Sequence, residues 1–179
     1  MVVSTRLVRL RKAAGWLSFG MLFASLAAPA AAQGARGKAE MKAGPGVVTV
    51  DYGRPSLKGR DMLTRLQDGS FWRMGMNEAT VLTTPVDLAF GATTVAKGSY
   101  SLWLKKEGAK FLLVFNSETG QWGTRHDPAK DVHRVEMKAQ TLSSPVETFT
   151  IDLEEAAKGG EFALAWGETR LSSGFTFGD

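Results

Sequence analysis

Cysteine is absent from the 179-residue sequence. The chain can therefore form no disulfide bond and carry no lipid on an N-terminal cysteine, which excludes a disulfide-stabilised fold and a lipoprotein. Histidine is scarce, with two residues, and neither an H-x-H nor an H-E-x-x-H spacing occurs, so the usual zinc motifs are missing as well. The fold must be stabilised by a hydrophobic core.

A long apolar run is also missing. The run Ala13–Ala28 is shorter than the roughly 20 apolar residues of a membrane-spanning helix, and Pro29 closes it. Four basic residues precede the run, and Ala30–Ala32 fits an A-x-A cleavage site ahead of Gln33. A membrane anchor is the alternative interpretation, but this pattern is typical of a signal peptide over residues 1–32.

The third absence is an excess of one charge in the chain that cleavage would leave. All four charged residues of the predicted signal peptide are basic, so cleavage would lower the formal net charge from +4 to 0. A neutral chain offers no basic surface for nucleic acid, so we expect no nucleic-acid partner. Cleavage would also leave no stable membrane anchor, and we expect a periplasmic or secreted protein.

The remaining pattern is that of strands. Residues 33–45 are rich in Gly, Ala and Lys without periodicity, and we interpret them as a flexible leader before one domain, residues 46–179. From Val47–Tyr52 onward, short apolar or alternating segments are separated by turn residues about every 8 to 12 positions. The only early helical signal is Asp61, a cap for a short helix. The sequence predicts an all-β fold: a single-domain antiparallel β-sandwich or barrel-like fold of about ten short strands with one short helix.

The stretch Phe71–Thr84 gathers side chains suited to recognition. Arginine offers a planar donor fork to a carboxylate or phosphate, asparagine offers a donor and an acceptor, and tryptophan offers a flat face for stacking. We expect this stretch to supply a ligand site on a loop between strands. The predicted ligand-binding residues are Arg54, Trp72, Arg73, Asn77, Glu78 and Trp122.

Several distinct motifs lie along the chain between Tyr52 and Gly167. They are Tyr52-Gly53-Arg54-Pro55 with Lys58-Gly59-Arg60, Trp72-Arg73-x-Gly75-x-Asn77-Glu78-Ala79-Thr80, Gly98-x-Tyr100-Ser101-Leu102, Phe115-Asn116, Gln121-Trp122-Gly123, Asp127 with Asp131-Val132, Val146-Glu147-Thr148-Phe149 and Trp166-Gly167. With these motifs the chain resembles the bacterial domain-of-unknown-function family 2911 (DUF2911) from about Val47 to Phe177. The resemblance implies a small, exported, β-rich bacterial protein and assigns no activity.

The main hypothesis is a periplasmic binding protein without covalent chemistry. Its partner would be a small anion, a sugar or an envelope glycan, and no cofactor is expected. Arg73 would hold the anion, Asn77 and Glu78 would contact polar groups, and Trp122 would form a stacking wall. Arg54 could join Arg73 in an anion pocket together with Arg60, or these arginines could be separate solvated charges.

Two other classes of function stay open. In a hydrolase, Glu78 would be the general base and Arg73 would stabilise negative charge. In a structural envelope protein the motif would tie strands together: Arg73 would pair with Glu78 or Asp51, Asn77 would adopt a left-handed turn beside Gly75, and Trp72 would fill the core. Burying that indole would contribute about 4–6 kcal/mol.

Two further features have alternative interpretations. His126, Asp127 and Asp131 lie in a polar loop and could supply metal ligands, but no zinc spacing occurs and Asp127 precedes proline as in a turn, so no metal site is predicted. Trp103 faces away from the apolar side of its strand. An exposed Trp103 would be a carbohydrate platform, and a buried one would pack against a second layer.

Overall fold

The computed structural model describes Met1 and residues 36–178 of the protein. Apart from Met1, the predicted signal peptide over residues 1–32 lies outside the described residues. Among the described residues, no helix is long and apolar enough to cross a membrane.

Ten strands form one antiparallel sheet, and the predicted all-β fold is confirmed. Neighbouring strands follow the order β1-β2-β4-β7-β8-β9-β10-β5-β6, and β3 pairs with β7 beside this path. The strands are β1 (Arg36–Ala43), β2 (Gly46–Gly53), β3 (Phe71–Trp72), β4 (Thr80–Thr84), β5 (Leu88–Phe90), β6 (Thr93–Val95), β7 (Gly98–Glu107), β8 (Lys110–Asn116), β9 (Asp131–Ala156) and β10 (Gly159–Phe177), and the helical elements are α1 (Met62–Arg65) and the 3-10 turn η1 (Pro128–Lys130).

Two of the strands are far longer than the short strands predicted from the sequence. β9 has 26 residues and β10 has 19. The register between them shifts on both sides of Gly167, whose φ is +58°. A bulge bends a strand without ending it, which explains why the turn-like residues in the middle of β9 do not terminate it.

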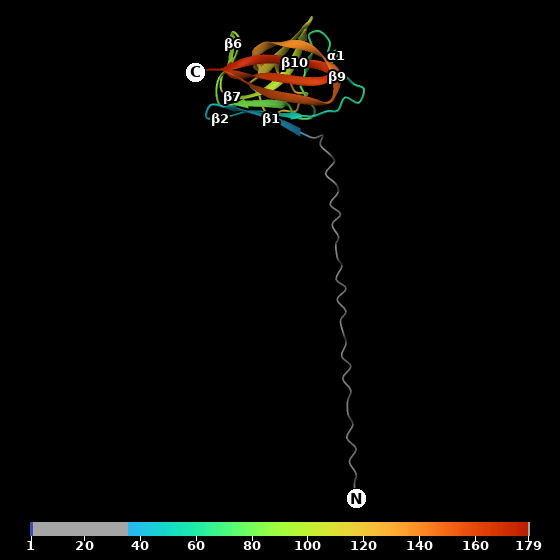
Figure 1. Ribbon diagram of the computed structural model, residues 1–179. Coiled ribbons are helices and arrows are strands. Elements are labelled where there is room, and N and C mark those ends of the chain that lie inside the picture. Colours follow the sequence, from blue (N-terminus) through green and yellow to red (C-terminus); the bar gives the residue numbers. More distant parts are fainter. Residues whose placement is uncertain (2–35, 179) are drawn as a thin grey trace. The chain divides into compact units, whose positions relative to one another are not determined.

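The sheet curls so that both ends of the strand order enclose one core. β1 lies against β9 as well as beside β2, and Figure 1 shows β9 and β10 as a layer over β7, β2 and β1. Alternation of side chains along the strands sends every second residue inward. The fully buried large side chains are Phe115, Phe149, Phe162, Leu63, Met74, Leu82, Leu88, Leu102, Leu104, Leu113, Ile151 and Leu164.

The predicted flexible leader is wrong for residues 36–43, which form the edge strand β1. Ala39, Met41 and Ala43 point into the core and alternate with exposed charged residues. The strand returns into β2 through Gly44 at φ +54° followed by Pro45, a sequence suited to a tight hairpin turn. Alanine and lysine are weak strand formers, so the composition of this segment did not indicate a strand. The alternation of apolar and charged residues was the feature that indicates one.

The predicted helix cap at Asp61 is confirmed. Its Oδ1 accepts hydrogen bonds from the backbone nitrogens of Leu63 at 2.9 Å and Thr64 at 3.2 Å. These bonds satisfy two of the amides that a helix start leaves unpaired. The short helix α1 places Leu63 in the core beside β10.

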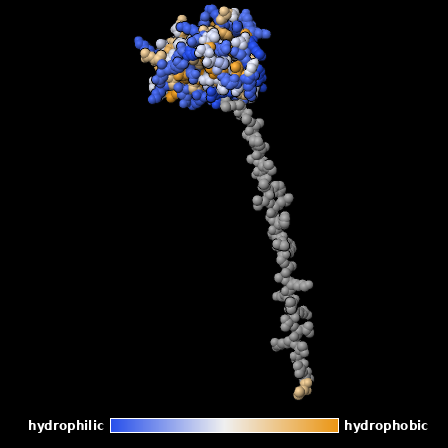
Figure 2. Space-filling view, turned by 45° about the vertical axis from the view of Figure 1, so that its right-hand side comes forward, coloured by the Kyte–Doolittle hydropathy of each residue, from blue (hydrophilic) through white to orange (hydrophobic). Residues whose placement is uncertain are grey.

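The face of the domain shown in Figure 2 is mainly hydrophilic. On the face shown in Figure 2, apolar residues are scattered among polar ones. Within residues 36–178 the large apolar side chains classed as exposed are Val47, Met62, Trp122 and Val132.

Candidate functional site

The segment after β3 makes a tight loop with unusual backbone geometry. Met74, Gly75 and Asn77 have φ values of +51°, +153° and +63°. The left-handed conformation predicted for Asn77 is therefore confirmed. Thr80 Oγ1 donates to the Met74 carbonyl at 2.7 Å, and Arg73 Nε donates to the Gly75 carbonyl at 3.2 Å. These bonds hold the loop on the end of the sheet.

A second segment, residues 121–123, is fastened to this loop through the backbone. The amide of Ala79 donates to the Gln121 carbonyl at 3.1 Å, and the amide of Gly123 donates to the Asn77 carbonyl at 2.8 Å. A side chain at Gly123 would lie 2.6 Å from both the Arg73 Cδ and the Asn77 carbonyl oxygen. The close approach explains why glycine follows Trp122.

A cavity of about 590 Å³ opens beside these two segments. This volume lies within the range of small-molecule sites, which are mostly apolar with a few placed polar groups. Residues from the loop after β2, from β3, from β7, from the polar loop and from β10 meet here. The lining residues are Pro55, Ser56, Arg60, Met62, Phe71, Trp72, Arg73, Gly75, Met76, Trp103, Gly123, Thr124, His126 and Trp166.

Four aromatic side chains, Phe71, Trp72, Trp103 and Trp166, give the cavity an apolar wall. The indoles of Trp72 and Trp166 are stacked, with ring centres 5.6 Å apart and planes 11° from parallel. Phe149 supports both from the core side, at 5.0 Å from Trp72. Trp103 is buried and its Nε1 donates to Ser101 Oγ at 3.1 Å. The second-layer interpretation of Trp103 is thus confirmed, and the residue also lines the cavity.

The charged side chains that line the cavity are cationic. Arg60 is exposed and Arg73 is partly buried. No aspartate or glutamate is among the lining residues, and neither arginine has a carboxylate within salt-bridge distance in the described part of the chain. Two lining arginines that form no salt bridge among the described residues make this cavity suited to an anion.

The six predicted site residues separate into two groups. Trp72 and Arg73 line the cavity, whereas Arg54, Asn77, Glu78 and Trp122 lie outside its lining. Arg54 Nε donates to the Phe149 carbonyl at 3.5 Å. The side chain of Trp122 is 47% exposed, and its backbone forms a bridge with Glu78.

Glu78 is paired outside the cavity. Arg36 of β1 donates to Glu78 Oε2 at 3.0 Å and also pairs with Asp51 of β2. The partner considered from the sequence, Arg73, bonds Gly75 instead. Arg36 lies in the segment interpreted as a leader, so the sequence offered no reason to consider it. Glu78 thus connects the motif to the edge strand.

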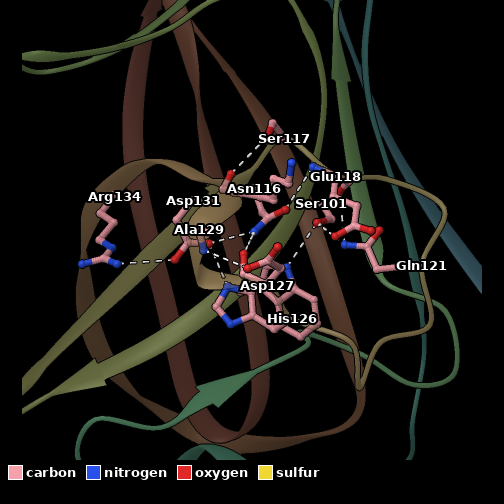
Figure 3. Close-up of polar contacts among 12 residues, drawn as sticks. Ser101, Asn116, Ser117, Glu118, Gln121, His126, Asp127, Ala129, Asp131 and Arg134 are labelled. Carbon is pink, nitrogen blue, oxygen red and sulfur yellow. Dashed lines mark hydrogen bonds and ion pairs between the residues drawn. The ribbon is translucent and has the colours of Figure 1, made fainter.

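His126 lines the cavity and is joined to a polar network with Asp131 and Asn116. Figure 3 shows its imidazole directed at Asp131, with Asn116 beside that carboxylate. His126 Nε2 lies 2.8 Å from Asp131 Oδ1, and Asn116 Nδ2 donates to the same oxygen at 2.9 Å. The His126 ring packs between Phe71, at 4.2 Å between ring centres, and Trp103, at 4.6 Å. Within the described residues, no group of three or more His, Cys, Asp or Glu could hold a metal ion.

Sequence reasoning missed His126, Trp103 and Trp166 as cavity residues. They come from three segments that are distant in the chain, and only the curl of the sheet brings them together. Arg60 was considered in the sequence only as a possible member of an anion pocket. The sequence feature that could have indicated His126 is the polar loop between β8 and β9, which has the length and composition of a functional loop.

Neither curated proteins nor solved structures yield a match to this sequence. The family described as a protein of unknown function (DUF2911) matches residues 35–175, well over half of the chain. This agrees with the resemblance carried by the Trp-Arg and Asn-Glu-Ala-Thr motifs. The protein belongs to the DUF2911 family.

Proposed function

We propose that the protein binds a small anion that carries a flat or ring-shaped apolar part. The observation that carries this proposal is the cavity of about 590 Å³, in which stacked Trp72 and Trp166 lie beside Arg60 and Arg73. Aromatic faces accept a ring, and guanidinium forks accept a carboxylate, sulfonate or phosphate. A cavity of this size favours a small molecule over a polymer.

The alternatives receive less support from the geometry. A hydrolase that uses Glu78 as its base needs this carboxylate in a concave site, but Glu78 is 44% exposed and paired with Arg36. A purely structural role accounts for Asn77 and Glu78, which fasten the motif to β1 and to residues 121–123. It gives no reason for two arginines beside an open aromatic cavity.

A binding experiment tests the proposal. 1-Naphthalenesulfonate has a ring and a charge that does not titrate, and isothermal titration calorimetry measures its affinity. We expect Arg73→Gln to weaken binding about 10- to 100-fold, the effect of losing a charge-assisted hydrogen bond. The neutral analogue 1-naphthalenesulfonamide should bind the parent and the variant equally.

Arg54→Gln is the matched control, because Arg54 lies in the same motif region but outside the cavity lining. Its affinity for 1-naphthalenesulfonate should stay within about twofold of the parent. Absence of binding to the parent at millimolar concentration, or equal losses in both variants, would refute the proposed site.

We further propose that binding takes place after export, in the periplasm or outside the cell. Support comes from the basic, apolar and A-x-A segments of residues 1–32. Sequencing the N-terminus of the protein recovered from a bacterial periplasmic fraction should give Gln33 first. Recovery of the uncleaved chain from the cytoplasm would contradict this part of the proposal.

A further inference from the structure

Asp131 fixes the orientation of His126. The Asp131 side chain is 4% exposed and receives three contacts: His126 Nε2 and Asn116 Nδ2 at Oδ1, and Arg134 at Oδ2 at 3.4 Å. Asn116 also donates to the Asp127 carbonyl at 2.8 Å, which secures the loop that carries His126. The imidazole is therefore held in place on the cavity wall by a buried acceptor (Figure 3).

This contact determines which ring nitrogen exchanges a proton. A carboxylate can only accept hydrogen bonds, so Nε2 of His126 carries a hydrogen and donates it to Asp131. Nδ1 is then the nitrogen that is protonated or unprotonated. Among the described residues, Nδ1 has no hydrogen-bond partner, and His126 lines the cavity. When protonated, Nδ1 becomes a donor that a ligand can use.

Two aromatic rings and one carboxylate surround His126. Phe71 and Trp103 lie within the distance at which an aromatic face attracts a cation. Asp131 adds a negative charge at 2.8 Å.

Several charged side chains from other elements lie near His126. Arg134 neutralises part of the Asp131 charge, and Arg60 and Arg73 line the same cavity as His126. Lys105 Nζ lies 5.4 Å from the Phe71 ring centre and pairs with Glu107. The Asp127 side chain accepts a hydrogen bond from the amide of Ala129 and caps η1. An anion in the cavity would offset the three arginines and favour the protonated imidazole.

We propose that His126 is a proton-carrying contact of the cavity: positioned by Asp131, it takes up a proton as the anionic ligand binds. This inference rests on the proposed function and deepens it. The site then has one titratable donor beside two permanent cations, and it binds an anion more tightly as the pH falls through the range in which histidine titrates.

Calorimetry with 1-naphthalenesulfonate at pH 5.5, 6.5 and 8 tests the inference, because neither the probe nor arginine changes charge in this range. In the parent we expect affinity to rise about tenfold from pH 8 to pH 5.5, and heats in buffers of different ionisation enthalpy to show proton uptake at pH 6.5. His126→Gln should bind with less than about a twofold change over the same range. Asp131→Asn removes the carboxylate that positions the imidazole, so its change in affinity over the same pH range should be smaller than that of the parent.

His133→Gln is the control, since His133 is the other histidine of the chain and does not line the cavity. It should keep the pH dependence of the parent. If the parent binds the probe equally at all three pH values, or if His126→Gln keeps the slope, the inference is overturned while the proposed function stands. If the parent binds no probe at any pH, both are overturned.

A second measurement avoids dependence on the folding of His126→Gln. The imidazole proton signals of the parent are followed by NMR with and without the probe, and His133→Gln assigns them. We expect saturation with 1-naphthalenesulfonate to move the titration of His126 to higher pH and to leave His133 unchanged. Equal titration of His126 with and without the probe would contradict proton uptake at this residue.

Discussion

At the scale of single residues, the site depends on backbone positions that few residues tolerate. Gly75 has φ +153°, and a Cβ there would lie 2.8 Å from the Gly53 carbonyl oxygen. Asn77 adopts the left-handed region that asparagine accepts more readily than most residues. These positions turn Arg73 toward the cavity and Glu78 away from it.

Gly75→Ala should lower the free energy of unfolding by about 1–3 kcal/mol, because the new methyl group adds a clash to a strained φ. Urea denaturation measures the change. Gly120→Ala is the control, since Gly120 has φ +82° but open space around it. A loss at Gly75 no larger than that at Gly120 would show that the close approach to Gly53 is unimportant.

Tyr100 supplies a prediction about alkaline pH. Burial, and then the charge of Asp87, raise the pKa of Tyr100 above its ordinary value, and its hydroxyl donates to the Ala96 carbonyl at 2.9 Å. The folded protein holds this proton more tightly than the unfolded chain. The resulting stability is complete below the ordinary tyrosine pKa of about 10 and is lost as the pH rises through the higher folded value.

Tyr100→Phe removes the group that titrates. The stability difference between parent and variant, measured by urea denaturation, should therefore shrink between pH 8 and pH 11. A constant difference over this range would contradict the assignment.

At the scale of elements, β1 joins the core to the motif. Met41 is buried against the sheet, and Arg36 bridges Asp51 of β2 and Glu78 of the loop. Surface ion pairs of this kind contribute only about 0–1 kcal/mol each. The stability that β1 provides therefore comes from its buried apolar face. The ion pairs of Arg36 fix the position of the loop that carries Glu78 relative to β1.

Met41→Ala should destabilise the protein by about 2–5 kcal/mol, the usual cost of a cavity in a core. Met62→Ala, at a side chain that is 39% exposed, should cost much less. Thermal or urea unfolding of the two variants compares them directly. Equal and small effects would mean that residues 36–43 do not form a strand in solution.

Many of these strands and the helix α1 could be predicted from the sequence alone. The strands around Val48, Tyr100 and Phe162 have a large apolar residue at every second position, and the capping side chain of Asp61 marks the start of its helix. The strand β1 was not predicted because its residues include alanine and lysine, which are weak strand formers. The strand β9 was predicted as separate short strands because turn-like residues interrupt its pattern, but a bulge bends a strand without ending it. The cavity could be predicted only in part, since Trp72 and Arg73 come from one motif whereas His126 and Trp166 arrive through long-range packing.

At the scale of the whole molecule, the curled sheet positions distant segments around one opening. The loop after β2, the loop after β3, the polar loop before β9 and the interior of β10 converge on an aromatic wall. Sites that rigid elements support need little ordering when a ligand binds, which lowers the cost of association. We propose that this opening, rather than the exposed Trp122, receives the ligand.

The most direct test locates bound 1-naphthalenesulfonate by intermolecular nuclear Overhauser effects to the assigned indoles. We expect cross-peaks from the naphthalene protons to the Trp72 and Trp166 rings and none to Trp122. Cross-peaks to Trp122 alone would place the ligand on the outer face of the loop and contradict the account.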